Sequence, residues 1–332
     1  MSWTAERLSQ VATGYWSSQV LMTAVQLGVF DALPGETGQV CSACGLDLRT
    51  GGMLLEALGG MGLLVRSAGG VWQAAEGAGP LLQRRSPTSL APALELNAAM
   101  AGLWAKLPEL VKTGRPVVPP GAHLGGDPER TRGFVLAMEA RGRAVLPAVV
   151  SALPLDGVLT LLDVGSGAGT LGRLLVERDP RLRVTLLDLP AVTDFARTLT
   201  AAHPHAGRIT HLAADYLKAP LPGPFDAVVW CGAMHQHDRA KARELVAKLA
   251  AAARPGGGRV IVVDLMAGTG LPGGFSELFA LNMALVSPVA RVHTPSEVRD
   301  DLQAAGLGDI TDAPATAADG TAIYHIVSGV RG

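Results

Sequence analysis

The stretch that decides the fold is Leu161-Leu162-Asp163-Val164-Gly165-Ser166-Gly167-Ala168-Gly169, where an apolar segment runs into three glycines at alternate positions. A second apolar segment, Val184-Thr185-Leu186-Leu187-Asp188, ends in an acid 23 residues after the first of these glycines. Glycines let a backbone turn sharply and approach a ligand closely. An acid at the tip of the next strand can bind the hydroxyls of a ribose. The two segments therefore predict a site for a small molecule that carries a nucleoside.

Apolar and amphipathic segments alternate along the chain from Val158 onward. The predicted helices cover 170–178, 191–202, 238–253 and 295–305, and the predicted strands between them cover 158–164, 183–188, 208–213, 225–231 and 258–265. This alternation is typical of a parallel sheet with helices on both faces. Two further predicted strands, 308–314 and 321–328, have a short connection, which indicates an antiparallel hairpin at the sheet edge.

The chain before this alternation is predicted to be mainly helical. Apolar residues recur at helical spacing over 17–33 and 53–64, and two short strands around a Gly-Gly turn follow at 65–73. Helices followed by a small hairpin suggest a winged-helix module. Two more predicted helices, 88–113 and 128–152, flank a linker at 115–126 that is rich in proline and glycine. We expect three parts, with boundaries at 1–90, 91–152 and 153–332.

The composition excludes several classes of protein. A net charge of −1 over 332 residues gives no electrostatic reason to expect a nucleic-acid partner. No apolar run approaches the roughly 18–20 residues that a membrane helix needs, and the N-terminus lacks the pattern of a secretory signal. The three cysteines are too few for a disulfide framework, and Cys41-Ser-Ala-Cys44 alone is a weak zinc signal. We expect a cytoplasmic protein without a bound metal.

The glycines also fit the fingerprint of a dinucleotide site. Read from Gly167, the segment reaches Gly172 as GxGxxG, and Asp188 follows about 20 residues further on. In the dinucleotide fold, however, the first glycine closes the turn from strand to helix, and here that glycine is Gly165. In that register Thr170 stands where the third glycine belongs. The segments after the glycines must therefore decide between a dinucleotide and another molecule that carries a nucleoside.

Six segments, in this order and spacing, resemble the class I S-adenosylmethionine-dependent methyltransferases. They are LLDVGSGAGT (161–170), TLLDLP (185–190), AADY (213–216), FDAVVWCGAMH (225–235), ARPGGGRVIVVD (253–264) and HTPSEVRDDLQAAGL (293–307). More closely, the chain resembles the small-molecule O-methyltransferase family of bacterial natural-product and plant phenylpropanoid enzymes. The resemblance implies an α/β, Rossmann-like domain with a seven-stranded, mostly parallel sheet and an antiparallel edge hairpin. A winged-helix dimerisation domain precedes it, and the protein is expected to form a homodimer.

The resemblance also implies S-adenosylmethionine as the cofactor and S-adenosylhomocysteine as its product. The glycine loop passes under the methionine part, and the next two strand ends supply groups for the ribose and the adenine. One further position, Cys231, falls where plant members often carry a lysine that contacts the cofactor, so we expect that contact to be replaced. The cofactor residues implied in this way are Gly165, Gly167, Gly169, Asp188, Leu189, Asp215, Tyr216 and Cys231.

The segment after the fourth predicted strand carries the chemistry that the resemblance implies. His235 stands at the position of the catalytic base, and free imidazole, with a pKa of about 6.5, is partly neutral at pH 7. Asp264 fills the position of one supporting acid, whereas Val292 stands at the position of the other. Gln236 and His237 replace an Asp-Trp pair that is common in plant members. These departures keep open C-methylation, or decarboxylation, hydroxylation or pericyclic chemistry, with the same fold and cofactor.

The acceptor pocket is expected between the Rossmann-like domain and the helices before it. Mostly apolar side chains suit a flat or greasy acceptor, and the candidate walls are Met100, Trp104, Phe134, Met138, Phe279, Asn282 and Met283. We therefore expect methyl transfer to a hydroxyl of an aromatic or polyketide-like small molecule. A DNA-binding role would need a basic recognition helix, but residues 50–64 contain a single charged residue, Glu56.

Overall fold

The computed structural model describes residues 2–118 and 127–332, and the chain divides into two compact units, Met1–Gly102 and Leu103–Gly332. Residues 119–126 of the predicted linker lie outside the described residues. Each unit is built around its own buried core.

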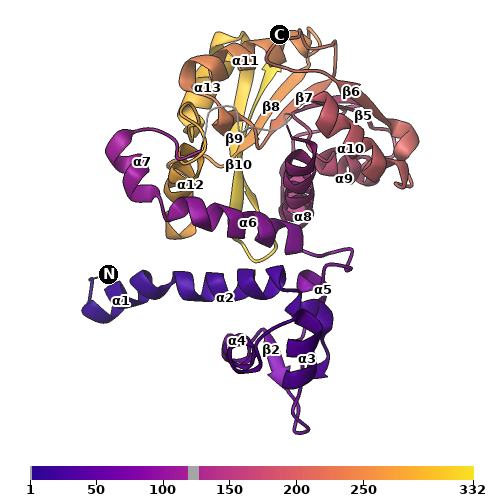
Figure 1. Cartoon of the computed structure of the whole chain (residues 1–332). Coiled ribbons are helices and arrows are strands. Elements are labelled where there is room, and N and C mark those ends of the chain that lie inside the picture. The colour runs from indigo at the N-terminus through magenta and orange to yellow at the C-terminus, as the bar shows by residue number, and fades with distance from the viewer. Residues whose placement is uncertain (1, 119–126) are drawn as a thin grey trace. The chain divides into compact units, whose positions relative to one another are not determined.

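The second unit is built on a seven-stranded sheet with the strand order β6-β5-β4-β7-β8-β10-β9 (Figure 1). The first five of these strands are parallel neighbours, whereas β10 pairs antiparallel with both β8 and β9. This confirms the predicted parallel sheet with an antiparallel hairpin at one edge. The strands are β4 (Thr160–Val164), β5 (Arg183–Asp188), β6 (Ile209–Ala213), β7 (Ala227–Cys231), β8 (Arg259–Asp264), β9 (Leu307–Thr316) and β10 (Ala322–Arg331).

Helices cover both faces of this sheet, as the alternating pattern predicts (Figure 1). One face packs against α8 and α9, and the other packs against α11 and α13. The helices of this unit are α7 (Leu107–Thr113), α8 (Pro128–Ala152), α9 (Thr170–Arg178), α10 (Pro190–Ala201), α11 (Arg239–Ala252), α12 (Phe275–Ala284) and α13 (Pro295–Ala304). Short 3-10 turns, η2 (Ala206–Arg208), η3 (Met234–Gln236) and η4 (Pro272–Gly274), complete it.

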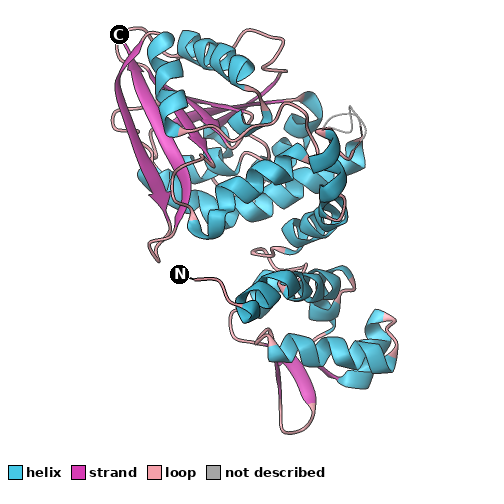
Figure 2. Ribbon diagram, turned by 90° about the vertical axis from the view of Figure 1, so that its left-hand side faces the viewer, coloured by secondary structure: helices cyan, strands magenta, loops and turns pink. Residues whose placement is uncertain are grey.

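The first unit is mainly helical with a small antiparallel sheet, as expected for a winged-helix module (Figure 2). Its strands, in the order β1-β3-β2, are β1 (Gly35–Glu36), β2 (Leu64–Arg66) and β3 (Val71–Ala74). Phe30, Leu55 and Trp72 lie in its core. The helices are α1 (Ala5–Thr13), α2 (Tyr15–Gln26), η1 (Val29–Ala32), α3 (Thr37–Cys44), α4 (Leu48–Gly60), α5 (Ala78–Leu82) and α6 (Ala91–Trp104), which ends in the second unit.

Two predicted helices are shorter than the sequence pattern indicates. The predicted helix over 88–113 is broken into α6 and α7, because Pro108 fits only the first turn of a helix and so starts a new one. The predicted helix over 17–33 ends at Gln26, and Gly28 adopts a left-handed φ of 75° before the short turn η1. Apolar periodicity continues through both breaks, which is why the pattern did not reveal them.

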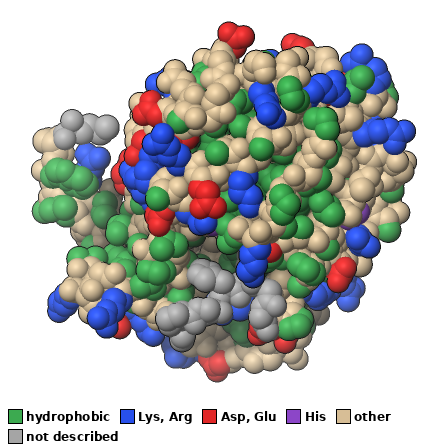
Figure 3. Space-filling view, turned by 90° about the horizontal axis from the view of Figure 1, so that it is seen from above, with side chains coloured by type: hydrophobic (Ala, Val, Ile, Leu, Met, Phe, Trp, Pro, Cys, Tyr) green, Lys and Arg blue, Asp and Glu red, His purple; other side chains and the backbone are tan. Residues whose placement is uncertain are grey.

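The face in Figure 3 carries basic and acidic side chains interspersed among hydrophobic ones. Within residues 2–118 and 127–332, no helix is both long and apolar enough to cross a lipid bilayer.

Candidate active site

The glycine loop between β4 and α9 packs against β5 on one side and faces open space at Gly167. Gly165, Gly167 and Gly169 all have left-handed φ angles, of 70°, 55° and 74°. A Cβ on Gly169 would lie 2.5 Å from Cδ1 of Leu186, so packing of the loop against β5 requires glycine there. A Cβ on Gly167 would meet no atom within 4 Å. The loop thus presents backbone to open space, as a bound cofactor needs.

Asp188, at the end of β5, connects this strand to the glycine loop. Its Oδ2 accepts a hydrogen bond of 2.8 Å from the backbone N–H of Gly167, and its Oδ1 accepts one of 2.7 Å from Leu189. Burial raises the pKa of Asp188, and these two backbone donors work against that rise. Each carboxylate oxygen keeps a second lone pair, so the carboxylate can still accept from a ribose diol.

Asp215 and Tyr216 follow β6 at the same edge of the sheet. Burial works against ionisation of Asp215, but bonds from the Leu217 N–H at 2.9 Å and the Lys218 ammonium at 3.1 Å lower its pKa. The ring of Tyr216 lies beside the glycine loop, because a Cβ on Gly165 would be 3.6 Å from its Cε1. An acid and an aromatic ring therefore stand next to the loop.

Asp163 lies on β4, two residues before Gly165. It is an acid that the sequence analysis did not identify as a candidate site residue. It is 2% exposed, and its Oδ2 has no hydrogen-bond partner among the described residues. Burial, together with the charge of Asp188, raises the pKa of Asp163 to about 7. An acid inside an otherwise apolar strand was the signal available in the sequence.

These residues fit S-adenosylmethionine. The cofactor carries a positive sulfonium and an ammonium group, and the described site offers the acidic side chains of Asp163, Asp188 and Asp215 near an open glycine loop. At the end of β7, burial raises the pKa of the Cys231 thiol well above its usual range. Cys231 is therefore a neutral group, unlike the lysine that plant members often carry there.

His235 lies in η3, directly after β7, and is held at three points. Its Nδ1 is 2.8 Å from Oδ1 of Asp264, and its backbone N–H donates to Oδ2 of the same carboxylate at 3.1 Å. Its carbonyl accepts from the backbone N–H of Arg291 at 2.8 Å. The ring edge also meets Phe279, with centroids 4.9 Å apart. Its Nε2 makes no hydrogen bond to the part of the chain that the structure describes.

The segment around Val292 supports this turn through its backbone. Arg291 donates to His235, and the carbonyl of His293 accepts from Ala267 at 2.9 Å. Val292 itself is 8% exposed. Within the described residues, Asp264 is thus the one carboxylate that is bonded to the His235 ring.

The predicted acceptor walls fall on three helices. Phe279, Asn282 and Met283 are spaced by three and four residues on α12 and so share one face. The indole N–H of Trp104 donates to Oδ1 of Asn282 at 2.9 Å. The remaining predicted walls are Phe134 and Met138, one turn apart on α8, and Met100 on α6 within the first unit.

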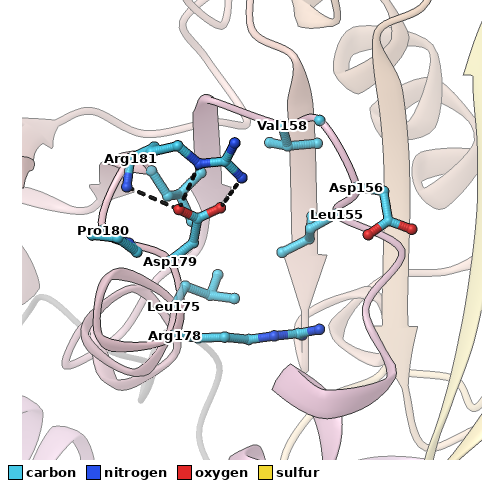
Figure 4. Close-up of a pocket in the computed structure, with 10 residues that line it drawn as sticks. Leu155, Asp156, Val158, Leu175, Arg178, Asp179, Pro180 and Arg181 are labelled. Carbon is cyan, nitrogen blue, oxygen red and sulfur yellow. Dashed lines mark hydrogen bonds and ion pairs between the residues drawn. The ribbon is translucent and has the colours of Figure 1, made fainter.

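A pocket of about 350 Å³ lies elsewhere on the second unit (Figure 4). It is lined by 155–158, Leu175 and 178–182, next to the amino ends of β4 and β5, whereas the glycine loop and Asp188 lie at their carboxyl ends. Asp179 and Arg181 pair at 2.9 Å on its rim. Among the described residues, no group of three or more His, Cys, Asp or Glu side chains is placed to hold a metal ion.

The sheet order, the glycine loop and the acid at the end of β5 define an S-adenosylmethionine-dependent methyltransferase. Residues 113–308 match the model of the O-methyltransferase domain, and residues 9–84 match the O-methyltransferase dimerisation domain. The chain therefore belongs to the O-methyltransferase family.

Similar proteins come from bacteria and animals. The tetracenomycin polyketide synthesis 8-O-methyl transferase TcmO of Streptomyces glaucescens is 29% identical over 95% of this chain and 94% of its own length. The acetylserotonin O-methyltransferase of Bos taurus is 29% identical over 91% of this chain and 92% of its own length. Human N-acetylserotonin methyltransferase in complex with S-adenosylmethionine superposes with a TM-score of 0.88 at 25% identity, covering 100% of this chain and 99% of that structure.

The buried ring of His237 predicts a pH dependence of stability. Burial, together with nearby His235, Lys241 and His293, lowers the pKa of His237 from its ordinary 6.5 to about 4, while Asp238 opposes this shift. The unfolded chain takes up this proton near pH 6.5 and the folded chain does not. The free energy of unfolding should therefore fall by up to about 3 kcal/mol as pH decreases from 6.5 to 4.

Urea unfolding at several pH values measures this loss, with His237→Gln as the control because glutamine does not titrate. We expect the wild-type free energy of unfolding to fall more steeply between pH 6.5 and 4 than that of the variant. Identical slopes for the two proteins would show that His237 is not responsible.

Proposed function

We propose that the protein transfers a methyl group from S-adenosylmethionine to a hydroxyl of an aromatic or polyketide-like small molecule, with His235 as general base. The observation that carries this proposal is the pair of His235 and Asp264 beside the glycine loop. A Cβ on Gly165 would lie 3.5 Å from the Cβ of Ala233, which is two residues before His235. The turn that carries the imidazole is therefore packed against the proposed cofactor loop.

The cofactor, when bound, supplies an electrophilic methyl group on a sulfonium. Nε2 of His235 accepts the proton of the acceptor hydroxyl. The hydroxyl oxygen becomes bonded to the methyl carbon as the bond between that carbon and the sulfonium sulfur breaks, which leaves S-adenosylhomocysteine. Nδ1 donates to Asp264, which fixes the ring orientation and stabilises the positive charge that develops on the imidazole. Such general-base assistance typically contributes about 10²–10⁴-fold, and positioning of the two reactants contributes about 7–11 kcal/mol.

The acceptor side combines apolar walls with one fixed polar group. Trp104 can only donate, so its bond to Oδ1 of Asn282 turns the amide nitrogen away from the indole. That nitrogen is then available as a donor to an oxygen of the acceptor. The names of two relatives, a tetracenomycin 8-O-methyl transferase and a 3-hydroxy-5-methyl-1-naphthoate 3-O-methyltransferase, support an aromatic, polyketide-like acceptor.

The direct test is incubation with methyl-labelled S-adenosylmethionine and a panel of hydroxynaphthoates and hydroxyanthraquinones. We expect a product that has gained one labelled methyl on oxygen, as located by mass and NMR spectra. A methyl found on carbon, or a changed acceptor without label, would instead support C-methylation or non-methylating chemistry. The apolar Val292 at the position of the second family acid is the observation that favours this alternative.

We also propose that the chain is organised as a dimerisation domain (1–90), linking helices (91–152) and a catalytic domain (153–332), and that it forms a homodimer. The match of residues 9–84 to the O-methyltransferase dimerisation domain supports this assembly. Large apolar side chains are exposed on the first two helices, at Leu8, Val11, Tyr15 and Trp16. A second copy would remove them from water.

Light scattering after gel filtration should give the mass of two chains. The double change Val11→Glu and Trp16→Glu should give one chain, because charges then replace the apolar contacts. Leu159→Glu, at an exposed apolar residue of the second unit, is the matched control and should remain dimeric. A wild-type mass of one chain would contradict the proposed assembly.

A further inference from the structure

His237 lies two residues after the proposed base, and its ring is almost completely enclosed. The residue is 8% exposed, and its Nε2 is 3.0 Å from the hydroxyl of Tyr216. The ring stacks on Trp230 of β7, with centroids 5.9 Å apart and planes 20° apart. The plane of the Tyr216 ring stands nearly perpendicular to it, at 89°. His237 therefore joins the segment after β6 to β7.

The Tyr216 phenol and the His237 ring are both neutral at pH 7. Burial and the charge of Asp188 raise the pKa of the Tyr216 phenol, so the phenol keeps its proton. Burial lowers the pKa of His237 to about 4, so the ring is uncharged. The phenol oxygen and Nε2 of His237 therefore share a hydrogen bond between two neutral groups.

The backbone of His237 belongs to the turn that carries the base. Its N–H donates to the carbonyl of Met234 at 3.1 Å, which closes η3. Its carbonyl accepts from Nε2 of His293, a residue that is 2% exposed, at 3.0 Å. The ring of His237 is thus anchored on a backbone that is itself fixed on two sides.

Tyr216 is held at both of its ends. Its carbonyl accepts from the Lys248 ammonium at 2.5 Å, and its hydroxyl is hydrogen-bonded to Nε2 of His237. Between these points, its ring lies beside Gly165 of the glycine loop. Loss of either anchor would free the ring at the edge of the proposed cofactor site.

We propose that His237 is a positioning residue that fixes the ring of Tyr216 against the adenine of the cofactor. The inference rests on the proposed placement of Tyr216 beside the adenine. It gives a histidine, at a position where plant members commonly carry tryptophan, a defined role in cofactor binding. His237 itself touches neither the acceptor nor the transferred methyl group in this assignment.

The test is a double-mutant cycle of His237→Phe and Tyr216→Phe in the full-length protein, with cofactor affinity measured by calorimetry in the absence of acceptor. Phenylalanine at 237 keeps a ring that can stack on Trp230 but removes the nitrogen that is hydrogen-bonded to Tyr216. Each single variant should bind S-adenosylmethionine about 5–10-fold more weakly, as loss of a buried hydrogen bond predicts. The double variant should be no weaker than the singles, because the bond is already absent.

Two further measurements separate positioning from a general loss of structure. Adenosine should lose affinity by the same factor as S-adenosylmethionine, because both present the adenine to Tyr216. The KM for the cofactor should rise, whereas kcat at saturating cofactor should stay near the wild-type value. His237→Gln restores a side chain that can hydrogen-bond to Tyr216 and should recover part of the affinity, and it also serves if His237→Phe does not fold.

Unchanged affinity in the single variants would overturn the proposal. So would independent, multiplicative losses in the double variant, or a loss for S-adenosylmethionine without one for adenosine. All of these are binding results without acceptor. A failure of the methyl-transfer assay with intact binding would therefore count against the proposed reaction and not against this role of His237.

Discussion

Replacement of His235 by alanine should lower kcat by about 10²–10⁴-fold and leave the affinity for S-adenosylmethionine unchanged. The reason is that Nε2 is the group proposed to take the acceptor proton, and the ring contacts Asp264 and Phe279 rather than the glycine loop. Steady-state rates with labelled cofactor measure the loss, and calorimetry measures the binding.

Asp264→Asn is the companion variant, because it keeps the size of the side chain and removes its charge. An imidazolium beside a neutral amide is less stable, so kcat should fall by less than in His235→Ala. The single oxygen of asparagine can still accept from the backbone N–H of His235, but the amide nitrogen then replaces Oδ1, which is bonded to the ring and to the Leu265 N–H. Full turnover of His235→Ala with an identified acceptor would show that positioning alone drives the reaction.

The second large effect is expected at Asp188, where replacement by alanine should weaken cofactor binding by about 100-fold. This corresponds to the loss of one or two hydrogen bonds to a charged group, at about 1.5–3 kcal/mol each. The substitution also leaves the backbone N–H groups of Gly167 and Leu189 without their partner. The effect should appear in the Kd of both S-adenosylmethionine and S-adenosylhomocysteine.

Asp179→Ala is the matched control for this experiment. Asp179 is also an acid next to β5, but it lies at the other end of the strand, on the rim of the pocket in Figure 4. It should leave the cofactor Kd unchanged. Equal affinities of wild type and Asp188→Ala would remove Asp188 from the site.

Much of the fold could be predicted because its signals are local. Buried strands such as Leu161–Val164 are apolar runs that end at glycine, and α8 and α13 begin at residues that satisfy their own first turns. Asp127 caps α8, and Thr294 forms a capping box with Glu297 at α13. The short strand β1 and helix α12 had no such pattern, because two residues give no period and α12 is apolar nearly all round.

The site was predictable only as a set of positions at strand ends. The carboxyl ends of parallel strands lie on the same side of the sheet. Gly165, Asp188 and His235 each stand at or after such an end, so their order in the sequence indicated a shared site. The bond from Gly167 to Asp188 joins the loop after β4 to the end of β5, and no local pattern encodes it. The pairing of Tyr216 with His237 is likewise a contact between loops, and no pattern in the sequence indicated that His237 is more than a loop residue.

The unequal surroundings of the loop glycines indicate where this enzyme could be redesigned to transfer groups larger than methyl. A Cβ on Gly169 or Gly172 would lie within 2.6 Å of Leu186. Substitutions at these two glycines would therefore separate α9 from β5. Phe279 instead lies on α12, where its ring edge meets the proposed base His235. Libraries for new alkylation chemistry are therefore best directed to α12.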